Sequence, residues 1–424
     1  MKKPFERFDM ARDPMRTKWY LKPITKLLSW PDMVTHRPAI HFHGVDKPLK
    51  PPYLMLCNHN AFMDFKVATQ VIYPHSANYV VAIDGFIGRE WLLRAVGCIC
   101  KRKFTNDTVL IRQLVKVILN GDIAVVYPEA RYSLCGTTAV LPSSLGKLCK
   151  LLKVPVVTFG THGHHANSPF WNLHDRKLHT EVDYTLLLTP EQVKELSVDE
   201  INNRIVDAFQ YDDVAWQKET GTVTKYPKRA EGLHKVLYQC PHCGKEFCMD
   251  SKDDTIYCTE CGKRWKLTEL MEIQAMEGET EFSHIPDWYE WERANGRKEV
   301  EAGKYDSGPL HVHVDSLPNS KRYIRLGNGT MRHDMTGFHV HGTDVDGDPF
   351  DMDWPVPSLY SVHIEYEYLG KYGDCVDLNT LQDTWYTYPE TFQKFSVTKM
   401  ALATEELYYA YRRSIGNPCP PGLA

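Results

Sequence analysis

The sequence has 424 residues, of which 43% are hydrophobic and 25% are charged, a composition that excludes wholesale disorder. Its formal net charge of -4 at pH 7 lacks the basic excess typical of nucleic-acid binding. No apolar run approaches the roughly 18 residues of a membrane-spanning helix, and we expect no secretory leader. At roughly 100–200 residues per domain, the length predicts two to four domains.

The first 30 residues form a basic segment, with eight Lys or Arg and three Asp or Glu. Within it, Thr17–Trp30 carries lysines at every fourth position, together with apolar residues and two tryptophans. Cations are attracted to anionic headgroups and tryptophan favours the membrane interface, so one interpretation is a peripheral anchor at the cytoplasmic face of a membrane. The other is a helix whose apolar side packs on the protein's own domain. The sequence leaves both open.

Short apolar runs then alternate with amphipathic stretches up to about residue 209. Thr108–Leu119 is predicted to be a helix that ends at Asn120-Gly121, and Ser197 with Glu200 forms the capping box of another helix. Strands buried on both faces are predicted at Tyr53–Cys57, Tyr79–Ala82, Ile123–Tyr127 and Val154–Phe159. Alternating strands and helices predict an α/β domain over residues 1–230, with a β-sheet flanked by helices.

Cys57-Asn-His-Asn-Ala-Phe-Met-Asp64 follows the first buried strand directly, which is where α/β proteins place their sites. His59 and Asp64 are five positions apart, so a strand-to-helix turn brings the carboxylate back to the imidazole. Such a carboxylate fixes the tautomer and leaves the other ring nitrogen free as a base. An isolated His-Asp pair with this spacing is more often structural than catalytic, so the choice between the two roles depends on the neighbouring motifs.

Three further segments supply that context. Gly97-Cys-Ile-Cys-Lys-Arg-Lys103 places three cations after an apolar turn, and Val154-Pro-Val-Val157 begins a later strand. Between them, Tyr127-Pro-Glu-Ala-Arg-Tyr-Ser133 ends a buried strand, so Glu129 and Arg131 are expected near the same sheet edge as His59. The chain order is therefore a base, a cationic loop, a Pro-Glu turn and a Val-Pro-Val strand.

In this order, residues 53–160 resemble the glycerolipid acyltransferase family, which includes the 1-acylglycerol-3-phosphate acyltransferases. That family carries an Asn-His-x-x-x-x-Asp box, a Gly-x-Ile loop leading to a basic residue, a Phe-Pro-Glu-Gly-Thr-Arg-Ser box and a Val-Pro-Val strand. The resemblance implies that His59 with Asp64 deprotonates an acceptor hydroxyl, which attacks the thioester of an acyl-CoA or acyl carrier protein without a covalent acyl-enzyme. It further implies a (lyso)phospholipid or glycerol-phosphate-like acceptor, positioned by Asn58, Lys101, Arg102, Lys103, Glu129 and Arg131.

Two boxes depart from the family pattern. In the third box Ala130 replaces Gly, Arg131 takes the Thr position and Tyr132 takes the Arg position, while in the second box Lys103 takes the Arg position. Because a guanidinium reads phosphate better than an ammonium, these changes bear on the acceptor and not on the base. They also leave open a zinc-containing scaffold that binds lipid or acyl groups without turnover.

A metal-dependent hydrolase is the third function considered. Thr161-His-Gly-His-His165 offers His162, His164 and His165 as ligands of a catalytic metal. No Asp or Glu lies among these five residues to complete such a site, so the hydrolase is the weaker alternative.

Four of the twelve cysteines form the pattern Cys240-Pro-His-Cys243, fourteen residues, Cys258-Thr-Glu-Cys261. Two such knuckles supply the four thiolates of a structural zinc ribbon, which we place at residues 234–275; two disulfides or a redox pair are the alternatives. Cys248 and His242 lie inside the unit and are expected not to be ligands. The remaining cysteines are scattered, as free thiols are in a reducing, cytoplasmic environment.

A helix beginning at Ile285 is expected to link the ribbon to the rest of the chain, over residues 280–300. Residues 301–424 then predict a mostly β domain that ends in a helix at about Ser396–Arg413, before a Pro-rich tail. Its strands are expected at His311–Val314, Tyr323–Leu326, Phe338–His341 and Val362–Tyr368, separated by Gly- and Asp-rich turns. Strands closed by one helix resemble a small barrel of the pleckstrin-homology type.

Overall fold

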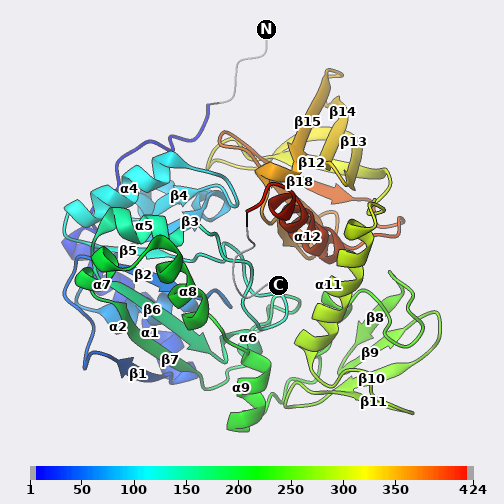
Figure 1. The fold of residues 1–424 in the computed structure, drawn as a ribbon, viewed down its shortest axis with the longest axis horizontal. Helices are drawn as coiled ribbons and strands as arrows, with labels where there is room; N and C mark the ends of the chain where they lie inside the picture. Colours follow the sequence, from blue (N-terminus) through cyan, green and yellow to red (C-terminus); the bar gives the residue numbers. More distant parts are fainter. Residues whose placement is uncertain (1–5, 418–424) are drawn as a thin grey trace.

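The computed structural model describes residues 6–417, which form three β-sheets with helices around and between them (Figure 1). A four-stranded sheet and a C-terminal seven-stranded sheet face the N-terminal domain, and helix α11 (Ile285–Glu301) runs between these two sheets. Residues 1–5 of the basic segment and the Pro-rich tail from residue 418 lie outside the described part. Within residues 6–417, no helix has both the length and the apolar character to cross a membrane.

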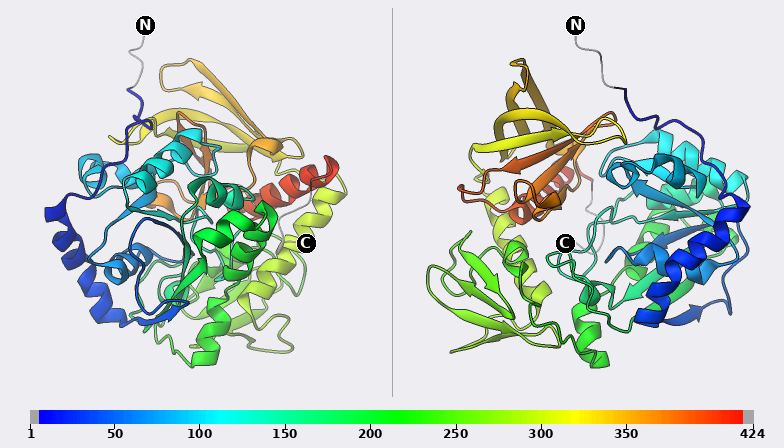
Figure 2. Two further views of the ribbon diagram at one scale, coloured as in Figure 1. Left: turned by 60° about the vertical axis from the view of Figure 1, so that its left-hand side comes forward. Right: turned by 180° about the vertical axis from the view of Figure 1, so that it is seen from behind.

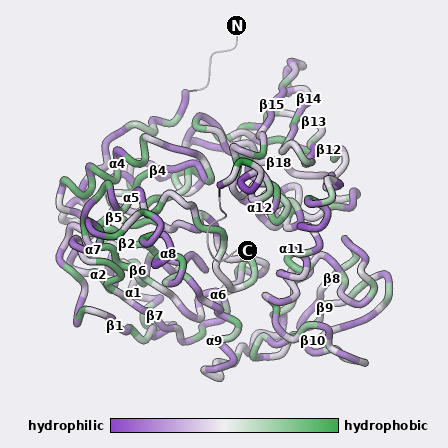
Figure 3. The backbone as a smooth tube through the Cα atoms, viewed as in Figure 1, coloured by the Kyte–Doolittle hydropathy of each residue, from purple (hydrophilic) through white to green (hydrophobic). Residues whose placement is uncertain are grey.

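The N-terminal sheet has the order β1-β7-β6-β2-β5-β3-β4 and a hydrophobic centre (Figure 3). Its central strand β2 (Tyr53–Cys57) is buried at every residue and runs parallel to β5 (Ile123–Val126) and β6 (Val156–His162). The segments that follow these three strands therefore meet at one edge of the sheet. The remaining strands are β1 (Ala39–His43), β3 (Ala77–Ala82), β4 (Ile99–Lys101) and β7 (Glu181–Leu188).

The helices around this sheet begin where the sequence supplies caps. The Asp107 side chain accepts hydrogen bonds from two amides at the start of α4 (Thr108–Leu119), and Ser197 and Glu200 cap α8 (Val198–Ala208) reciprocally. The predicted α/β class is confirmed. The other helices are η1 (Trp19–Leu21), α1 (Lys22–His36), α2 (Asp64–Ile72), η2 (Ile83–Phe86), α3 (Glu90–Ala95), α5 (Leu145–Leu152), α6 (His164–Asn167), α7 (Pro190–Glu195) and α9 (Asp213–Thr220).

The small sheet with the cysteines has the order β11-β10-β9-β8. It packs on α11 through Trp265 and Trp288, whose ring centroids are 5.3 Å apart, and both tryptophans belong to one core that continues into the C-terminal sheet. Its elements are α10 (Leu233–Val236), β8 (Met249–Lys252), β9 (Thr255–Cys258), β10 (Arg264–Leu267) and β11 (Ile273–Ala275).

The C-terminal sheet is an antiparallel half-barrel with the order β15-β14-β13-β12-β18-β17-β16. Helix α12 (Val397–Ser414) packs against it and beside α11 (Figure 2). A mostly β domain with a terminal helix was predicted and is confirmed, although the sheet stays open. Its elements are β12 (Leu310–Ser316), β13 (Ile324–Asp334), β14 (Gly337–Asp344), β15 (Pro349–Pro355), η3 (Val356–Ser358), β16 (His363–Glu365), η4 (Tyr368–Gly370), β17 (Cys375–Asn379) and β18 (Thr384–Pro389).

Two strand predictions in this domain were wrong at their ends. Gly327 and Gly329 lie inside β13 and not in a turn. Strand β14 comes so close to them that a Cβ at these two positions would lie only 2.1 and 2.3 Å from its carbonyl oxygens. The strand expected at Val362–Tyr368 ends at Glu365, since Glu367 and Leu369 adopt φ values of +47° and +55° that extended backbone does not allow.

Candidate active site at the carboxyl ends of three strands

His59 and Asp64 face each other across the turn between β2 and α2. The His59 Nδ1 and Asp64 Oδ2 atoms are 3.0 Å apart, and the carboxylate is fully buried whereas a quarter of the His59 side chain is exposed. The backbone amides of Asn60 and Ala61 donate to the same oxygen, at 2.8 and 3.0 Å. This arrangement assigns the Nδ1 proton to the Asp64 side and leaves His59 Nε2 free to accept a proton.

A second histidine binds the other oxygen of Asp64. His164 lies at the start of α6, just after β6, and its Nδ1 is 2.6 Å from Asp64 Oδ1. Burial raises the pKa of Asp64, but the hydrogen bonds from His164 and His59 outweigh it and bring that pKa to about 2. Asp64 is therefore ionised at neutral pH.

The histidine cluster does not form the metal site of a hydrolase. His162 pairs with Asp183, at 2.9 Å, whereas His164 pairs with Asp64. His165 is buried against Trp171, and burial lowers its pKa to about 3. Gly163, with a φ of +79°, separates His162 at the end of β6 from His164 and His165 in α6.

Glu129 follows β5 and supports the backbone of the base. Its Oε1 accepts the amide of His59 at 3.1 Å, and its Oε2 accepts the amide of Ala139 at 2.8 Å and the hydroxyl of Tyr211 at 3.0 Å. The side chain is fully buried, and burial raises the pKa of Glu129 to about 7 against these hydrogen bonds. Its predicted contact with the acceptor is therefore replaced by a contact with the loop that carries His59.

His59 opens into a mostly apolar cavity of about 1170 Å³. The rings of Tyr127 and Tyr132 pack on its imidazole, with centroid distances of 4.3 and 4.4 Å. The lining continues in one direction to α1 and in another to the C-terminal domain, at Tyr323, Tyr360, His363, Glu365 and Tyr368. The base therefore faces a chamber large enough for an acyl chain, walled partly by residues more than 250 positions away in the chain.

Residues 39–161 match the family described as Acyltransferase. This segment runs from β1 to the end of β6 and contains His59, Asp64 and Glu129. The chain carries an acyltransferase-family domain. The 1-acyl-sn-glycerophosphate (LPA) acyltransferase PlsC from Thermotoga maritima is a similar solved structure: it is 14% identical, with a TM-score of 0.35 over 45% of this chain and 79% of that chain. No curated protein matches the chain.

The C-terminal domain supplies hydrogen-bond acceptors to both arginines of the acyltransferase boxes, and of the two only Arg131 also lines the cavity. Arg102, 1% exposed, donates to the carbonyls of Leu317, Pro318 and Gln382 and to the Thr384 hydroxyl, at 2.7 to 3.2 Å. Arg131 pairs with Glu405 at 2.7 Å, and Glu405 also holds Arg293 of α11 at 2.7 Å. The phosphate contacts predicted for Arg102 and Arg131 stay predictions, and in this structure both guanidinium groups bind acceptors of the protein in a buried network.

Lys101 and Lys103 do line the cavity, and each has a partner. The Lys101 Nζ donates to the carbonyl of Thr105 at 2.8 Å, and the Lys103 Nζ lies 3.7 Å from Asp84, 3.9 Å from Glu365 and 4.0 Å from Asp377. Asn58 is buried and binds Thr161 of β6, donating to its carbonyl at 2.9 Å and accepting from its amide at 2.8 Å. Asn58 thus joins strand ends instead of reaching substrate.

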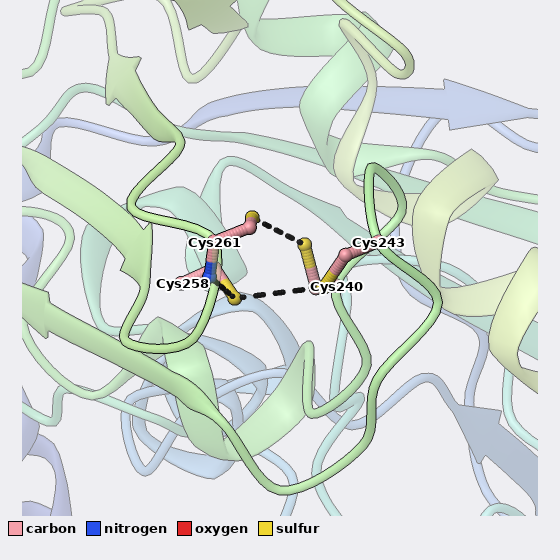
Figure 4. Close-up of side chains that lie close together, drawn as sticks. All are labelled: Cys240, Cys243, Cys258 and Cys261. Atoms are coloured by element: carbon pink, nitrogen blue, oxygen red, sulfur yellow. Dashed lines mark hydrogen bonds between the residues drawn. The ribbon is translucent and has the colours of Figure 1, made fainter.

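The four cysteines predicted as ligands converge on one point (Figure 4). Their sulfurs all lie within 4.8 Å of one another, and the Cys240–Cys261 and Cys243–Cys258 pairs are each 3.8 Å apart. Four sulfurs around zinc at about 2.3 Å would be about 3.8 Å apart, so the cluster fits this ion. His242 turns away to Glu281, whereas Cys248, expected not to be a ligand, lies 3.5 Å from Cys258.

The two knuckles have the same backbone. Gly244 and Gly262 have φ values of +73° and +76°, and their amides donate to the carbonyls of Cys240 and Cys258. Burial raises the pKa of Cys258, yet the nearby amides of Cys261 and Glu260 lower it to about 7. The backbone therefore favours the thiolate form at Cys258, whereas burial raises the pKa values of Cys240 and Cys261.

Sequence reasoning missed His164, Tyr127, Tyr132 and Tyr211 as parts of the site. The sequence suggests His164 only as a metal ligand, because no neighbouring residue indicates a contact with Asp64, which lies 100 positions earlier. Its position directly after the third of the three central strands was the available signal.

Proposed function

We propose that the protein is an O-acyltransferase that moves a fatty acyl group from acyl-CoA or acyl carrier protein to a hydroxyl of a (lyso)phospholipid or glycerol-phosphate-like acceptor. The observation that carries the proposal is the His59–Asp64 pair at the wall of a large apolar cavity, within an acyltransferase-family domain. The buried carboxylate supports the base role of His59, and the cavity supports a substrate with a fatty chain.

In the proposed reaction His59 Nε2 takes the proton of the acceptor hydroxyl, and the oxygen attacks the thioester carbonyl. The tetrahedral intermediate collapses by breaking the carbon–sulfur bond, and the departing thiolate takes the proton back from His59. Ionised Asp64 stabilises the imidazolium between these steps. The products are an acylated acceptor and a free thiol.

At the acceptor end of the proposal, the guanidinium groups of Arg102 and Arg131 already bind acceptors of the protein. The Lys and Arg side chains that line the cavity are Lys22, Lys66, Arg89, Lys101, Lys103 and Arg131, and Lys103 already lies within 4.0 Å of three carboxyl groups. A phosphate group would have to compete with these carboxylates, which supports testing neutral and zwitterionic lysophospholipids alongside phosphate monoesters.

We further propose that α1 brings the cavity to a membrane surface. Trp19, Leu27 and Leu28 are 81%, 71% and 68% exposed, and Leu21, Ile24 and Leu28 also line the cavity. A bilayer that covers these side chains would lie over the cavity. Leu27→Ser with Leu28→Ser should weaken flotation with anionic vesicles about tenfold or more, and undiminished flotation would contradict this role. A cytoplasmic face agrees with the free thiols of all cysteines within residues 6–417.

We propose that Cys240, Cys243, Cys258 and Cys261 hold one structural zinc ion. With four protein ligands no position remains for substrate, so the ion would stabilise the small sheet and its contact with α11. Metal analysis of the purified protein should give one zinc per chain, with loss of the metal in Cys243→Ser. A metal-free wild type with two disulfides would contradict the assignment.

The decisive experiment follows free thiol release from acyl-CoA with and without a panel of acceptor lipids. The wild type should release thiol only with an acceptor, and His59→Ala should reduce the rate at least about 1000-fold at unchanged thermal stability. A protein that only binds lipid or acyl groups would release no acceptor-dependent thiol with any acceptor or donor. Equal rates for His59→Ala and wild type would remove His59 from the mechanism.

A further inference from the structure

We propose that His164 is a positioning residue of the acyl transfer: by donating from Nδ1 to Asp64 Oδ1, it fixes the carboxylate that orients His59. The inference rests on the proposed function. It stands on the 2.6 Å contact between two fully buried groups, directly behind the base. Because His59 lines the cavity and His164 does not, His164 acts through Asp64 and not on substrate.

The backbone around His164 holds the ring in place. Gly163 turns with a φ of +79°, and a Cβ at this position would lie 2.6 Å from the Trp216 ring, so only glycine fits. The buried Asp213 carboxylate accepts the amides of Gly163 and His165, at 2.9 and 2.8 Å. The segment after β6 is therefore fixed on both sides of His164.

The same segment is tied to the strand that carries the base. Asn58 directly precedes His59, and its side chain exchanges hydrogen bonds with the amide and carbonyl of Thr161. Asn58 and Thr161 thus set the distance between the ends of β2 and β6. With this spacing fixed, the His164 ring meets Asp64 from the side opposite His59.

Asp64 has four donors, distributed unequally between its oxygens. Oδ2 accepts from His59 and from the amides of Asn60 and Ala61, whereas Oδ1 accepts from His164. His164 Nε2 is buried and has no hydrogen-bond partner within residues 6–417. A proton on that nitrogen would be unsatisfied, whereas a proton on Nδ1 is donated to Asp64, so the contacts favour the tautomer that carries its proton on Nδ1.

One thiol and two phenols near Asp64 are uncharged at neutral pH, whereas Glu129, which accepts the amide of His59, has its pKa raised by burial to about 7. Burial raises the pKa values of the Cys57 thiol and of the Tyr127 and Tyr132 hydroxyls well above their ordinary ranges. Asp64 therefore shares its charge only between His59 and His164. Without His164, the carboxylate would rotate more freely and would concentrate its charge on His59.

Two measurable consequences follow. Loss of orientation lowers kcat, about tenfold or more in His164→Ala, with little change in KM because the substrate contacts are unaltered. The charge that His164 no longer shares stabilises protonated His59, so the acidic limb of the kcat profile moves to higher pH by about half a unit or more. A merely structural residue would not move this limb.

His162→Ala is the matched control, because it removes a second histidine–carboxylate pair two residues away without touching Asp64. It should leave kcat and the pH profile within about twofold of wild type. His164→Asn should recover part of the rate, since its amide nitrogen stands at the position of the imidazole Nδ1 and can donate to Asp64. This variant also tests the proposal if His164→Ala does not fold.

The double variant with Asp64→Asn completes the test. If His164 acts through Asp64, His164→Ala should add little to the loss in Asp64→Asn. Fully multiplicative losses would overturn the inference, as would a His164→Ala enzyme with the wild-type rate and pH profile. Acceptor-dependent release undiminished in His59→Ala would instead overturn the proposed function, so the two failures are distinguishable.

Discussion

Asp64 and the arginines of the two altered boxes are all buried charges, but they find their partners at different distances along the chain. Three of the four donors to Asp64 come from residues 59–61, within five positions of it. The acceptors of Arg102 lie more than 200 positions away, and so does Glu405, the partner of Arg131. The His59–Asp64 pair is assembled by one turn, whereas the arginines bind their acceptors only when the C-terminal domain is in place.

This difference shows that the boxes of the acyltransferase domain serve two purposes in this protein. The first box is the proposed centre of the chemistry, and most of its hydrogen bonds are local. The cations of the second and third boxes hold the C-terminal domain against the catalytic domain, because a guanidinium has five donors and can satisfy several distant acceptors at once. The following variants test this division, beginning with the local chemistry.

Asp64→Asn should have the largest effect, a loss of about 1000- to 10,000-fold in kcat. An amide presents a donor to one of the two histidines, so His59 loses its fixed tautomer and the imidazolium loses its counter-charge. Acceptor-dependent thiol release measures the rate, and circular dichroism provides the control for folding. Activity within tenfold of wild type would show that the first box is not the catalytic centre.

Glu405→Gln should cost about 3–5 kcal/mol in the free energy of unfolding. The carboxylate binds Arg131 and Arg293 with 2.7 Å contacts, so its removal takes the ion-pair partner from buried Arg131, whereas Arg293 keeps Glu290 and Glu406 at 3.0 and 3.6 Å. Chemical denaturation followed by tryptophan fluorescence measures the loss. The control is Glu301→Gln, which removes an exposed partner of Arg413 and should change stability by less than about 1 kcal/mol. Similar losses in both variants would contradict a special role for the buried network.

The same contrast explains how much of the molecule the sequence could predict. The strand before His59, the caps of α4 and α8, and the convergence of the four cysteines all depend on neighbours a few residues away, and these matched the structure. The partners of Arg102, Arg131 and His164 depend on how distant segments pack, which no local pattern records. A buried arginine and a phosphate-binding arginine look alike in sequence.

The open sheet and the long β13 have a similar cause. Gly327 and Gly329 are turn residues by local preference, but here they allow β13 and β14 to approach closely. The packing of a neighbouring strand overrode the local signal. For Glu129 the residue type suggested a substrate contact, whereas the structure directs both oxygens to backbone amides and a tyrosine.

Glu129→Gln tests a buried carboxylate that is intermediate between Asp64 and the arginines. Its donors lie 10 to 82 positions away along the chain, and none of them is charged. Burial raises the pKa of Glu129 from its ordinary value to about 7, so in the wild type this group lowers stability as pH rises from about 4.5 to about 7. Below this window both states are protonated and the contribution is absent. The Gln variant has no such titration, and its melting temperature relative to wild type should rise across the window, by an amount that corresponds to about 3 kcal/mol in the free energy of unfolding. If the melting temperatures of the two proteins change in parallel with pH, Glu129 is not the group that titrates in this window.

Arg102→Met should have the smallest effect and the one that bears most directly on the acceptor. The variant leaves buried carbonyls of Leu317, Pro318 and Gln382 without their donor, at a cost of ~1–2 kcal/mol in unfolding. If Arg102 serves only this contact, KM for a phosphate-monoester acceptor changes less than about twofold, whereas loss of a bidentate phosphate contact would raise it about tenfold or more. Lys103→Met is the companion variant, because its ammonium lies on the cavity wall. A large KM increase in Arg102→Met would mean that the arginine leaves the C-terminal domain when substrate binds. It would contradict the assignment of the second box to holding the C-terminal domain.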